Sequence, residues 1–513
     1  MKIPFDSSPI PWYSFPDYDK GLSMSIVAII GSGMGGLVAG NLLAKKDHKV
    51  TIFESHITPG GYTSGFWRKG FYFESGTLSF ESSDMVFGAM KEIGVYEKIP
   101  FSRQYGRWIY NDMDYQAQSS ADLKKALYES FPSELENLDR YFAEVDDMTQ
   151  AIISMGKPSN VFQTITLPLK ILKIIKLFKK YGNMTVPEFT AKYFDKDSSI
   201  YPLLKDMGYP DMSASILGMT IWSFHDDYWT VKTGMQSWAD VLVDNLKSLG
   251  GELKLKSRVD QIITKDGTAV GVTNQGEDFP ADYVIAASDY KKTFLSLLDD
   301  KSLVPQETQG KIEKAAVSEG FFTVYLGLNL PQEKMMEYLK IPHVYCFDDN
   351  PNVDIYNADD ESYFEKSFMM LYSPSLMNAD LAPEGKSSLM IQTMTPHQWM
   401  NNWGGSDRET YRNLKEKAKN ALIDKAVALI PNIRDYIEFE DAATPLTYER
   451  YTANTDGATS AWSWNPNKKF YERGMMANIK TPIKNLYIGS CWAVQIGGVP
   501  GAISAALECV KAI

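Results

Sequence analysis

Two features near the amino terminus have the residue types and spacing to bind a phosphate-bearing ligand. The first is the glycine run Gly31-Ser32-Gly33-Met34-Gly35-Gly36, and the second is Glu54, 18 residues after Gly36. Gly31 permits a tight turn, Gly33 lets the backbone approach a pyrophosphate, and Gly36 allows close packing of a helix on a strand. A carboxylate at residue 54 can accept a hydrogen bond from a ribose hydroxyl and would repel a 2′-phosphate. The pattern predicts a dinucleotide site that disfavours a 2′-phosphorylated ligand.

The order of the flanking elements makes this motif specific, because isolated glycine runs are common. Residues 25–30 form an apolar, β-branched run that predicts a buried parallel strand. The apolar spacing of residues 37–44 is helical, and residues 49–54 predict a second strand that ends in the acid. A strand, a glycine-rich turn and a helix place the ligand phosphates at the amino terminus of the helix.

Further motifs follow in a fixed order along the chain. They are Gly60-Gly61, then Gly70-Phe71-Tyr72-Phe73-Glu74-Ser75-Gly76, then Thr233-Gly234-Met235-Gln236, then Thr444-Pro445-Leu446-Thr447 with Arg450-Tyr451-Thr452, and finally Gly489 with Trp492, Gly497, Gly498, Val499 and Pro500. Together they resemble the flavoprotein family of phytoene desaturases, carotenoid isomerases and retinol saturases. The chain departs from the family pattern at Glu74 (usually Asp), Ser490 (Gly), Gln495 (Pro), Ile496 (Gly) and Ala505-Ala506 (Ser-Gly).

This resemblance implies FAD as the cofactor. The cofactor-binding residues expected on these motifs are Gly31, Ser32, Gly33, Met34, Gly35, Gly36, Glu54, Ser55, Gly60, Gly61, Tyr62, Val259, Ser490, Gly498, Val499 and Pro500. In the family, the strand that holds Val259 lays its backbone against the adenine, and the carboxy-terminal motif faces the isoalloxazine ring. Stably bound nicotinamide is not expected, because the chain has no second GxGxxG motif.

The predicted fold is α/β, with a discontinuous Rossmann-type FAD-binding domain of the glutathione-reductase/amine-oxidase kind and a mixed α/β substrate domain. The FAD-binding domain is expected over 24–100, 230–300 and 475–513, the substrate domain over 101–229 and 301–474, and an amino-terminal arm over 1–23. Between the motifs, Asp266-Gly267 separates two alternating runs and predicts a β-hairpin turn.

The family resemblance implies chemistry on carbon–carbon double bonds of a long apolar, unsaturated molecule, by desaturation, saturation or cis–trans isomerisation. A flavin amine oxidase and a non-catalytic lipid-binding escort of the GDP-dissociation-inhibitor kind are the alternatives. Two side chains are candidates for catalysis: His225 beside Asp226-Asp227 as a proton donor, and Trp492 as a wall of the flavin ring. Each has a structural alternative, a polar loop for His225 and a core aromatic for Trp492. Tyr448, Tyr451 and Trp462 are candidate lining residues of the substrate channel.

Composition excludes several classes of function. A formal net charge of −12 argues against nucleic acid as a partner. Three cysteines without a CxxC pair and five scattered histidines predict neither a disulfide framework nor a metal site, which favours a cytoplasmic location.

The first residues do not form a signal peptide, and the uncharged stretch 21–44 is better explained by a buried strand, turn and helix than by a membrane span. The electron partner and oligomeric state stay open.

One segment is basic in this acidic chain. Leu167–Gly182 contains five lysines and no acid, and on a helix Ile171, Ile174, Ile175 and Phe178 would share one face. A basic amphipathic helix of this kind suits an anionic membrane surface, and an ordinary solvated helix is the alternative. The segment is therefore expected either to close the substrate pocket or to contact a membrane peripherally.

Overall fold

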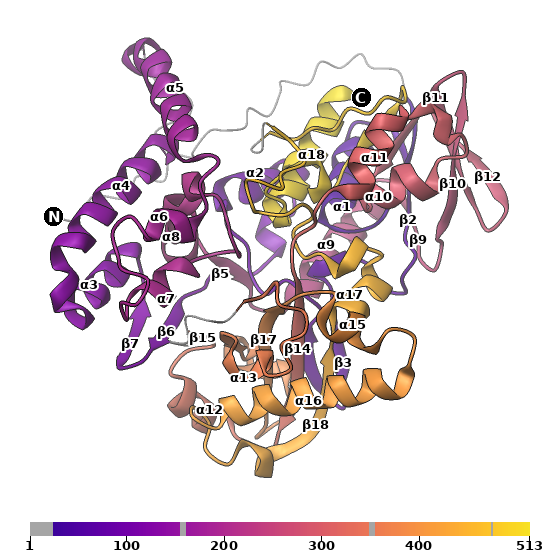
Figure 1. Ribbon diagram of the computed structural model, residues 1–513. Helices are drawn as coiled ribbons and strands as arrows, with labels where there is room; N and C mark the ends of the chain where they lie inside the picture. Colours follow the sequence, from indigo (N-terminus) through magenta and orange to yellow (C-terminus); the bar gives the residue numbers. More distant parts are fainter. Residues whose placement is uncertain (1–23, 154–160, 348–353, 473–475) are drawn as a thin grey trace.

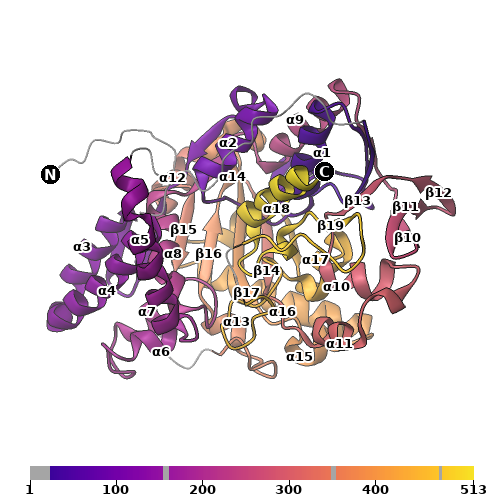
Figure 2. The same cartoon turned by 90° about the horizontal axis from the view of Figure 1, so that it is seen from above.

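The computed structural model describes residues 24–153, 161–347, 354–472 and 476–513, with the side chains of 161–167 left out. The predicted arm, 1–23, lies outside the described residues. Figures 1 and 2 show a helical lobe at one end of the molecule, a small three-stranded sheet at the other, and a large sheet between them. The described part of the chain contains no helix that is long and apolar enough to cross a membrane.

A five-stranded parallel sheet forms around the amino-terminal motif. Its order is β19-β13-β1-β2-β9, formed by Leu486–Ile488, Tyr283–Ala286, Ile26–Ile30, Lys49–Phe53 and Glu252–Lys254. Helix α1 (Met34–Lys45) follows β1 and packs against α9 (Met235–Ser248) and α18 (Gly498–Ala512). The predicted strand, glycine turn, helix and second strand are thus confirmed within a few residues. All five strands come from the segments that the sequence assigns to the FAD-binding domain.

A separate antiparallel sheet projects beside the parallel one. It consists of β10 (Val259–Lys265), β11 (Thr268–Asn274) and β12 (Glu277–Pro280). Asp266 and Gly267 connect β10 to β11 with φ values of 49° and 73°. Positive φ at both central residues is the signature of the tight hairpin turn that the Asp-Gly pair predicts, so this expectation is confirmed.

A seven-stranded mixed sheet forms the centre of the rest of the chain. Its order is β18-β14-β17-β16-β15-β6-β7, and its strands are Ile437–Ala443, Gly320–Leu328, Ser387–Thr395, Met369–Tyr372, His343–Cys346, Gly106–Tyr110 and Met113–Ala117. Helix α16 (Arg408–Ala426) covers one face through buried Ala418, Leu422 and Ile423 (Figure 1). All seven strands lie in the segments assigned to the substrate domain.

A helical lobe packs at the β7 edge of this sheet, where α3 contacts β7 (Figure 1). It contains α3 (Ser120–Ser130), α4 (Leu135–Ile153), α5 (Val161–Tyr181), α6 (Val186–Thr190), α7 (Tyr201–Lys205) and α8 (Leu217–Asp226), which share one apolar core. The remaining elements are β3 (Gly65–Arg68), β4 (Phe71–Glu74), α2 (Ser83–Ile93), β5 (Phe101–Arg103), β8 (Trp229–Val231), α10 (Tyr290–Lys292), α11 (Gln306–Lys314), α12 (Gln332–Leu339), α13 (Tyr363–Lys366), α14 (Pro374–Met377), α15 (Trp399–Gly404) and α17 (Pro445–Thr452).

The prediction that Ile171, Ile174, Ile175 and Phe178 share one apolar face of the basic segment is wrong in part. Helix α5 does form there, but Ile174 and Phe178 pack against the lobe core, whereas Ile171 and Ile175 are 40% and 57% exposed. The inward face also includes buried Leu177, which is not among the four residues that the sequence predicts for it. The exposed and buried apolar residues interleave in sequence because α4 contacts only one side of the helix.

Candidate functional site

A large cavity opens at the carboxyl ends of β1 and β2, where a doubly wound fold places its ligand. Its volume is about 1300 Å³, and its lining residues include Gly31 and Glu54 as well as Gly498 and Val499 at the start of α18. Cavities for a single small ligand usually have volumes of about 300–1000 Å³. The space is therefore large enough for a dinucleotide and part of a second molecule.

The glycine turn has one face packed and one face open. A Cβ atom at Gly36 would lie 2.0 Å from the Gly31 carbonyl oxygen, and one at Gly35 would lie 2.0 Å from the Gly489 carbonyl oxygen. At Gly33, by contrast, a Cβ would meet nothing within 4 Å. Gly33 caps α1 without any side-chain hydrogen bond, so the first backbone N–H groups of the helix have no capping side chain. This end of the cavity suits the phosphates of a dinucleotide.

Glu54 is held in place by the turn that it faces. Its Oε2 accepts hydrogen bonds from the Ser32 backbone N–H (2.9 Å) and hydroxyl (2.7 Å), and its Oε1 accepts one from the His56 backbone N–H (2.8 Å). Ser32 thus contacts Glu54 and does not line the cavity itself. Oε1 also accepts a longer hydrogen bond from the Ser55 hydroxyl (3.3 Å), so all four lone pairs of the carboxylate have a donor. A ribose hydroxyl would therefore bind Glu54 by replacing the rotatable Ser55 hydroxyl.

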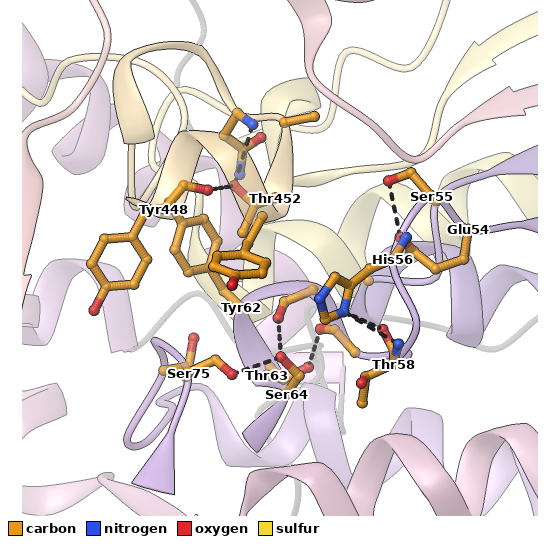
Figure 3. A pocket seen from close by; sticks show the side chains of 18 of the residues that line it. Glu54, Ser55, His56, Thr58, Tyr62, Thr63, Ser64, Ser75, Tyr448 and Thr452 are labelled. Atoms are coloured by element: carbon orange, nitrogen blue, oxygen red, sulfur yellow. Dashed lines mark hydrogen bonds between the residues drawn. The ribbon is translucent and has the colours of Figure 1, made fainter. Parts of the chain in front are cut away.

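The Gly60-Gly61 loop joins the glycine turn to the rest of the cavity wall. The Gly60 N–H donates to the Ser32 carbonyl oxygen (2.9 Å), and a Cβ at Gly61 would lie 3.3 Å from Gly33 Cα. Tyr62 follows, and its ring lies 5.8 Å from that of Tyr448 (Figure 3). Its hydroxyl donates to the Gly457 carbonyl oxygen (3.0 Å), and burial raises the pKa of this phenol. The two rings form an apolar wall in the middle of the cavity.

Behind this wall, Glu74 connects β4 to the start of α9. The Glu74 side chain is fully buried, its oxygens lie 3.1 and 3.2 Å from the Met235 N–H that begins α9, and Oε2 accepts from the Tyr72 hydroxyl (2.8 Å). Burial raises the pKa of the Glu74 carboxyl from 4.5 to about 8. The family's usual Asp is one methylene shorter, so the longer side chain spans this gap and positions α9 beside the Gly60-Gly61 loop.

The carboxy-terminal motif forms a further part of the cavity wall, next to the glycine turn. Trp492 lines the cavity, its Nε1 donates to Asn454 Oδ1 (3.0 Å), and its side chain is 1% exposed. Gln495, which replaces the family's Pro, accepts from the backbone N–H groups of Phe470 and Tyr471 (both 2.8 Å) and donates to the Ser463 carbonyl oxygen (2.7 Å). This departure from the motif therefore ties the chain around residues 463–471 to the cavity wall.

Most of the residues expected to bind the cofactor line this one cavity. Those that do are Gly31, Gly33, Met34, Gly35, Glu54, Ser55, Gly60, Gly61, Tyr62, Val259, Ser490, Gly498 and Val499. Ser32, Gly36 and Pro500 are behind the surface and do not line it. Among the channel candidates, Tyr448 and Tyr451 line the cavity, whereas Trp462 is fully buried and packs edge-on against Trp492.

His225 lies in a different place from the one that the sequence suggested. It is on α8 in the helical lobe, 2% exposed, and is not among the lining residues. Its ring stacks on Trp108 (4.8 Å between centroids), and its Nδ1 lies 2.9 Å from the Ile221 carbonyl oxygen. Burial lowers the pKa of His225 to about 4, so at neutral pH the imidazole is uncharged. In this structure its contacts are those of a core residue.

Sequence reasoning missed several lining residues because no motif marks them. Arg258, Asp289, Lys292, Tyr411 and Lys415 bring charge and hydrogen-bonding groups to the cavity. Arg450 also lines it and does stand in a quoted motif, although no role was predicted for it. Arg258 directly precedes Val259, and that adjacency was a usable signal. Across the described residues, no group of three His, Cys, Asp or Glu side chains could hold a metal ion.

Comparison with known proteins gives the family of this fold. The model of the family described as "Flavin containing amine oxidoreductase" matches residues 34–513. Three similar proteins are prolycopene isomerase 1, chloroplastic, of an Oncidium hybrid cultivar (24% identity; 92% of this chain, 80% of the relative), all-trans-retinol 13,14-reductase of Danio rerio (23%; 94% and 85%) and 4,4′-diapophytoene desaturase (4,4′-diapolycopene-forming) of a Methylomonas species (26%; 93% and 91%). An oxidoreductase from Methanosarcina mazei shares the fold, with a TM-score of 0.63 at 13% identity over 95% of this chain and all of that one.

Proposed function

The chain belongs to the family of flavin-containing amine oxidoreductases, and we propose that it acts on carbon–carbon double bonds of a long apolar, unsaturated molecule. It is an FAD-dependent oxidoreductase of the phytoene desaturase-like branch, to which its desaturase, isomerase and reductase relatives also belong. The names of these relatives describe polyene and retinoid substrates, and the size of the cavity is consistent with cofactor and substrate sharing one space.

The observation that carries this proposal is the open face of the glycine turn within the large cavity. Backbone at Gly31, Gly33 and Gly35 would hold the pyrophosphate, Glu54 with Ser55 the ribose, and Val259 the adenine. Gly60, Gly61 and Tyr62 would contact the ribityl chain, and Ser490, Gly498 and Val499 the ring end. Ser32, Gly36 and Pro500 would act indirectly, by shaping the turn, α1 and α18. Bound FAD supplies hydride or electron transfer at its ring.

The protein's own residues orient the substrate and exclude water from the cavity. Tyr62, Tyr448 and Trp492 present apolar ring surface along the cavity, and Trp492 would wall the flavin. No ionised side chain is needed for this role, because a hydrocarbon substrate binds by burial of its surface. The relatives that act on carotenoids and a retinoid favour this function over amine oxidation and over a lipid-binding escort.

The placement of the cofactor is tested by a pair of glycine substitutions. Gly33 has φ −65° and ψ 177°, which any residue adopts, and open space around its Cβ position. Gly33→Ala and Gly33→Val are therefore expected to leave stability within about 1 kcal/mol of wild type and to reduce bound FAD at least tenfold. The matched change Gly36→Ala clashes with a backbone carbonyl and is expected to destabilise the protein by about 1–3 kcal/mol.

Flavin content is measured by absorbance after gel filtration, and stability by urea unfolding of the same samples. A Gly33→Val protein that retains full FAD content would place the cofactor elsewhere. A colourless wild-type protein that stays colourless after incubation with FAD would favour the lipid-binding escort instead. Mass spectrometry of an organic extract of the purified protein would show whether a polyene, a retinoid or a fatty acid accompanies it.

We also propose that α5 contacts an anionic membrane surface, from which an apolar substrate would be drawn. At about 100° per residue, Leu169, Ile171, Leu172 and Ile175 lie on the outer face of the helix, and they are 67%, 40%, 60% and 57% exposed. Figure 1 shows this helix projecting from the lobe. Exposed apolar side chains gathered on one helical face are typical of interfacial helices.

Four of the five lysines of α5 divide into two groups. Lys173 pairs with Asp147 (2.5 Å) and Lys180 with Glu144 (3.1 Å), both acids of α4. Lys176 and Lys179, in contrast, form no ion pair with the described residues and share the outer face with Leu172. These two would attract anionic headgroups, at about 1 kcal/mol each. The helical lobe is thus the proposed side of the molecule that meets the membrane.

Vesicle flotation tests this contact. Binding to vesicles that contain phosphatidylserine is expected to fall about tenfold or more when Lys176 and Lys179 are both changed to Glu. It is expected to fall at least as much with Leu172→Gln and Ile175→Gln. Lys173→Gln combined with Asp147→Asn serves as the control, since it removes both members of an ion pair and leaves the net charge unchanged. Wild-type protein that fails to float at low salt, or variants that float equally well, would disprove the contact.

A further inference from the structure

A second, smaller cavity adjoins the one assigned to the cofactor. It has a volume of about 520 Å³ and is lined by Arg408, Tyr411, Arg412, Lys415, Glu416 and Arg450. Three of these residues, Tyr411, Lys415 and Arg450, also line the large cavity. We call this smaller cavity the arginine groove. A molecule bound in it could extend into the large cavity.

Two helices build the arginine groove. Positions 408, 411, 412, 415 and 416 have the i, i+3, i+4 spacing that places side chains on one face, here the first turns of α16. Arg450 comes from the last turn of α17. The Tyr411 hydroxyl lies 3.2 Å from Thr444 Oγ1 and 3.3 Å from Thr447 Oγ1, so it fixes α16 against the start of α17. The groove is therefore a built feature of the fold.

The cationic charge of the arginine groove is only partly compensated. Lys415 pairs with Asp441 (3.0 Å), and Glu416 pairs with Lys419 (2.8 Å) on its far side. Arg408, Arg412 and Arg450 form no ion pair with any residue that the structure describes, although the chain as a whole carries a net charge of −12. Arg450 instead lies over the Tyr451 ring (4.8 Å) at the margin of the large cavity. Three guanidinium groups without an ion pair among the described residues thus line one concave surface, and the one carboxylate that lines it, Glu416, is paired with Lys419.

We propose that the arginine groove binds the oxyanion of a small molecule, a phosphate or a carboxylate, whose remainder enters the large cavity. A guanidinium presents paired N–H donors that match the geometry of either oxyanion. Two sources share this chemistry: the phosphates of a diffusing dinucleotide reductant, and the carboxylate end of an apolar substrate. Binding of a substrate carboxylate rests on the proposed function, because it needs an apolar substrate in the large cavity. Binding of dinucleotide phosphates does not depend on which substrate the protein uses.

Binding of soluble probes to the FAD-loaded protein tests the proposal and distinguishes the sources. Equilibrium dialysis is run with NADP⁺ and with decanoate, and with adenosine and decanol as neutral counterparts. One of the two anions is expected to bind, more weakly as salt increases, and at least tenfold more tightly than its neutral counterpart. Arg408→Gln and Arg412→Gln are each expected to weaken that binding about tenfold.

Lys417→Gln is the matched control, because it removes one positive charge from the same helix outside the groove, where Lys417 pairs with Glu361 (3.0 Å). Its affinity for the probe is expected to stay within about twofold of wild type. The proposal is overturned if neither anion binds better than its neutral counterpart, or if Lys417→Gln weakens binding as much as Arg412→Gln. FAD content is measured in every variant and is expected to be unchanged, so that failure of the cofactor assignment is recognised separately.

Discussion

Glu74 gives the sharpest test of the physical reasoning, because its burial has a measurable consequence for stability. The carboxyl is fully buried, and its pKa rises from 4.5 to about 8. The folded protein therefore holds this proton more tightly than the unfolded chain. The stabilisation is complete below pH 4.5 and is lost as the pH rises through the folded pKa of about 8. One pKa unit corresponds to about 1.4 kcal/mol.

Between about pH 6 and about pH 8, the linkage contribution of Glu74 falls by about 2 kcal/mol. Glu74→Gln removes this titration and keeps an oxygen that can accept the Met235 N–H. Urea unfolding across this range is therefore expected to show wild type losing about 2 kcal/mol more than the variant. Other buried acids, such as Glu81 and Glu319, whose pKa values burial raises to about 7, titrate in both proteins and cancel.

Glu97→Gln, at an exposed position, is the control, and its unfolding free energy should follow wild type at every pH. If the Glu74→Gln curve also ran parallel to wild type, the reasoning would be wrong. Glu74 would then be ionised in the folded protein, with the N–H groups and dipole at the start of α9 stabilising the anion more than burial disfavours it.

Two further predictions concern His225, a candidate for catalysis, and Gln495, which replaces a Pro of the family motif. His225→Ala is expected to leave the pH profile of turnover unchanged and to destabilise the protein by about 2–4 kcal/mol in thermal or urea unfolding, because a buried ring stacked on Trp108 is lost. If the variant instead lost the fall in activity toward higher pH that a general acid produces, His225 would be a proton donor after all. Gln495→Ala removes three hydrogen bonds to the backbone of residues 463–471. It is expected to lower the free energy of unfolding by about 3 kcal/mol and to lower FAD content. An unchanged free energy of unfolding would show that this amide does not hold the cavity wall in place.

The sequence predicted those parts of the fold that local chemistry determines. The run 25–30, the glycine turn and the acid at 54 form β1, the start of α1 and the end of β2, because each depends on neighbours close in sequence. The Asp266-Gly267 hairpin follows for the same reason, since positive φ at both positions is a local preference. The motifs that resemble the family also fell around one cavity, although they are distant in the chain.

What the sequence missed depends on contacts between distant elements. The outer face of α5 could not be predicted because it depends on α4, whose Asp147 and Glu144 also neutralise two of the lysines. His225 was a plausible acid beside two aspartates, but its surroundings are set by Trp108 of β6. The arginine groove has no sequence motif, since it exists only where the first turns of α16 meet α17.

The central claim is that this flavoprotein changes carbon–carbon double bonds of a long apolar molecule. The most direct measurement is liquid chromatography with mass spectrometry of a polyene hydrocarbon incubated with the FAD-loaded protein, with the flavin oxidised in one sample and reduced in another. We expect a product that has lost two hydrogen atoms, gained two, or kept its mass with a changed retention time. We also expect Gly33→Val to abolish this product. Unchanged polyenes under both conditions, together with turnover of a primary amine to an aldehyde, would contradict the account.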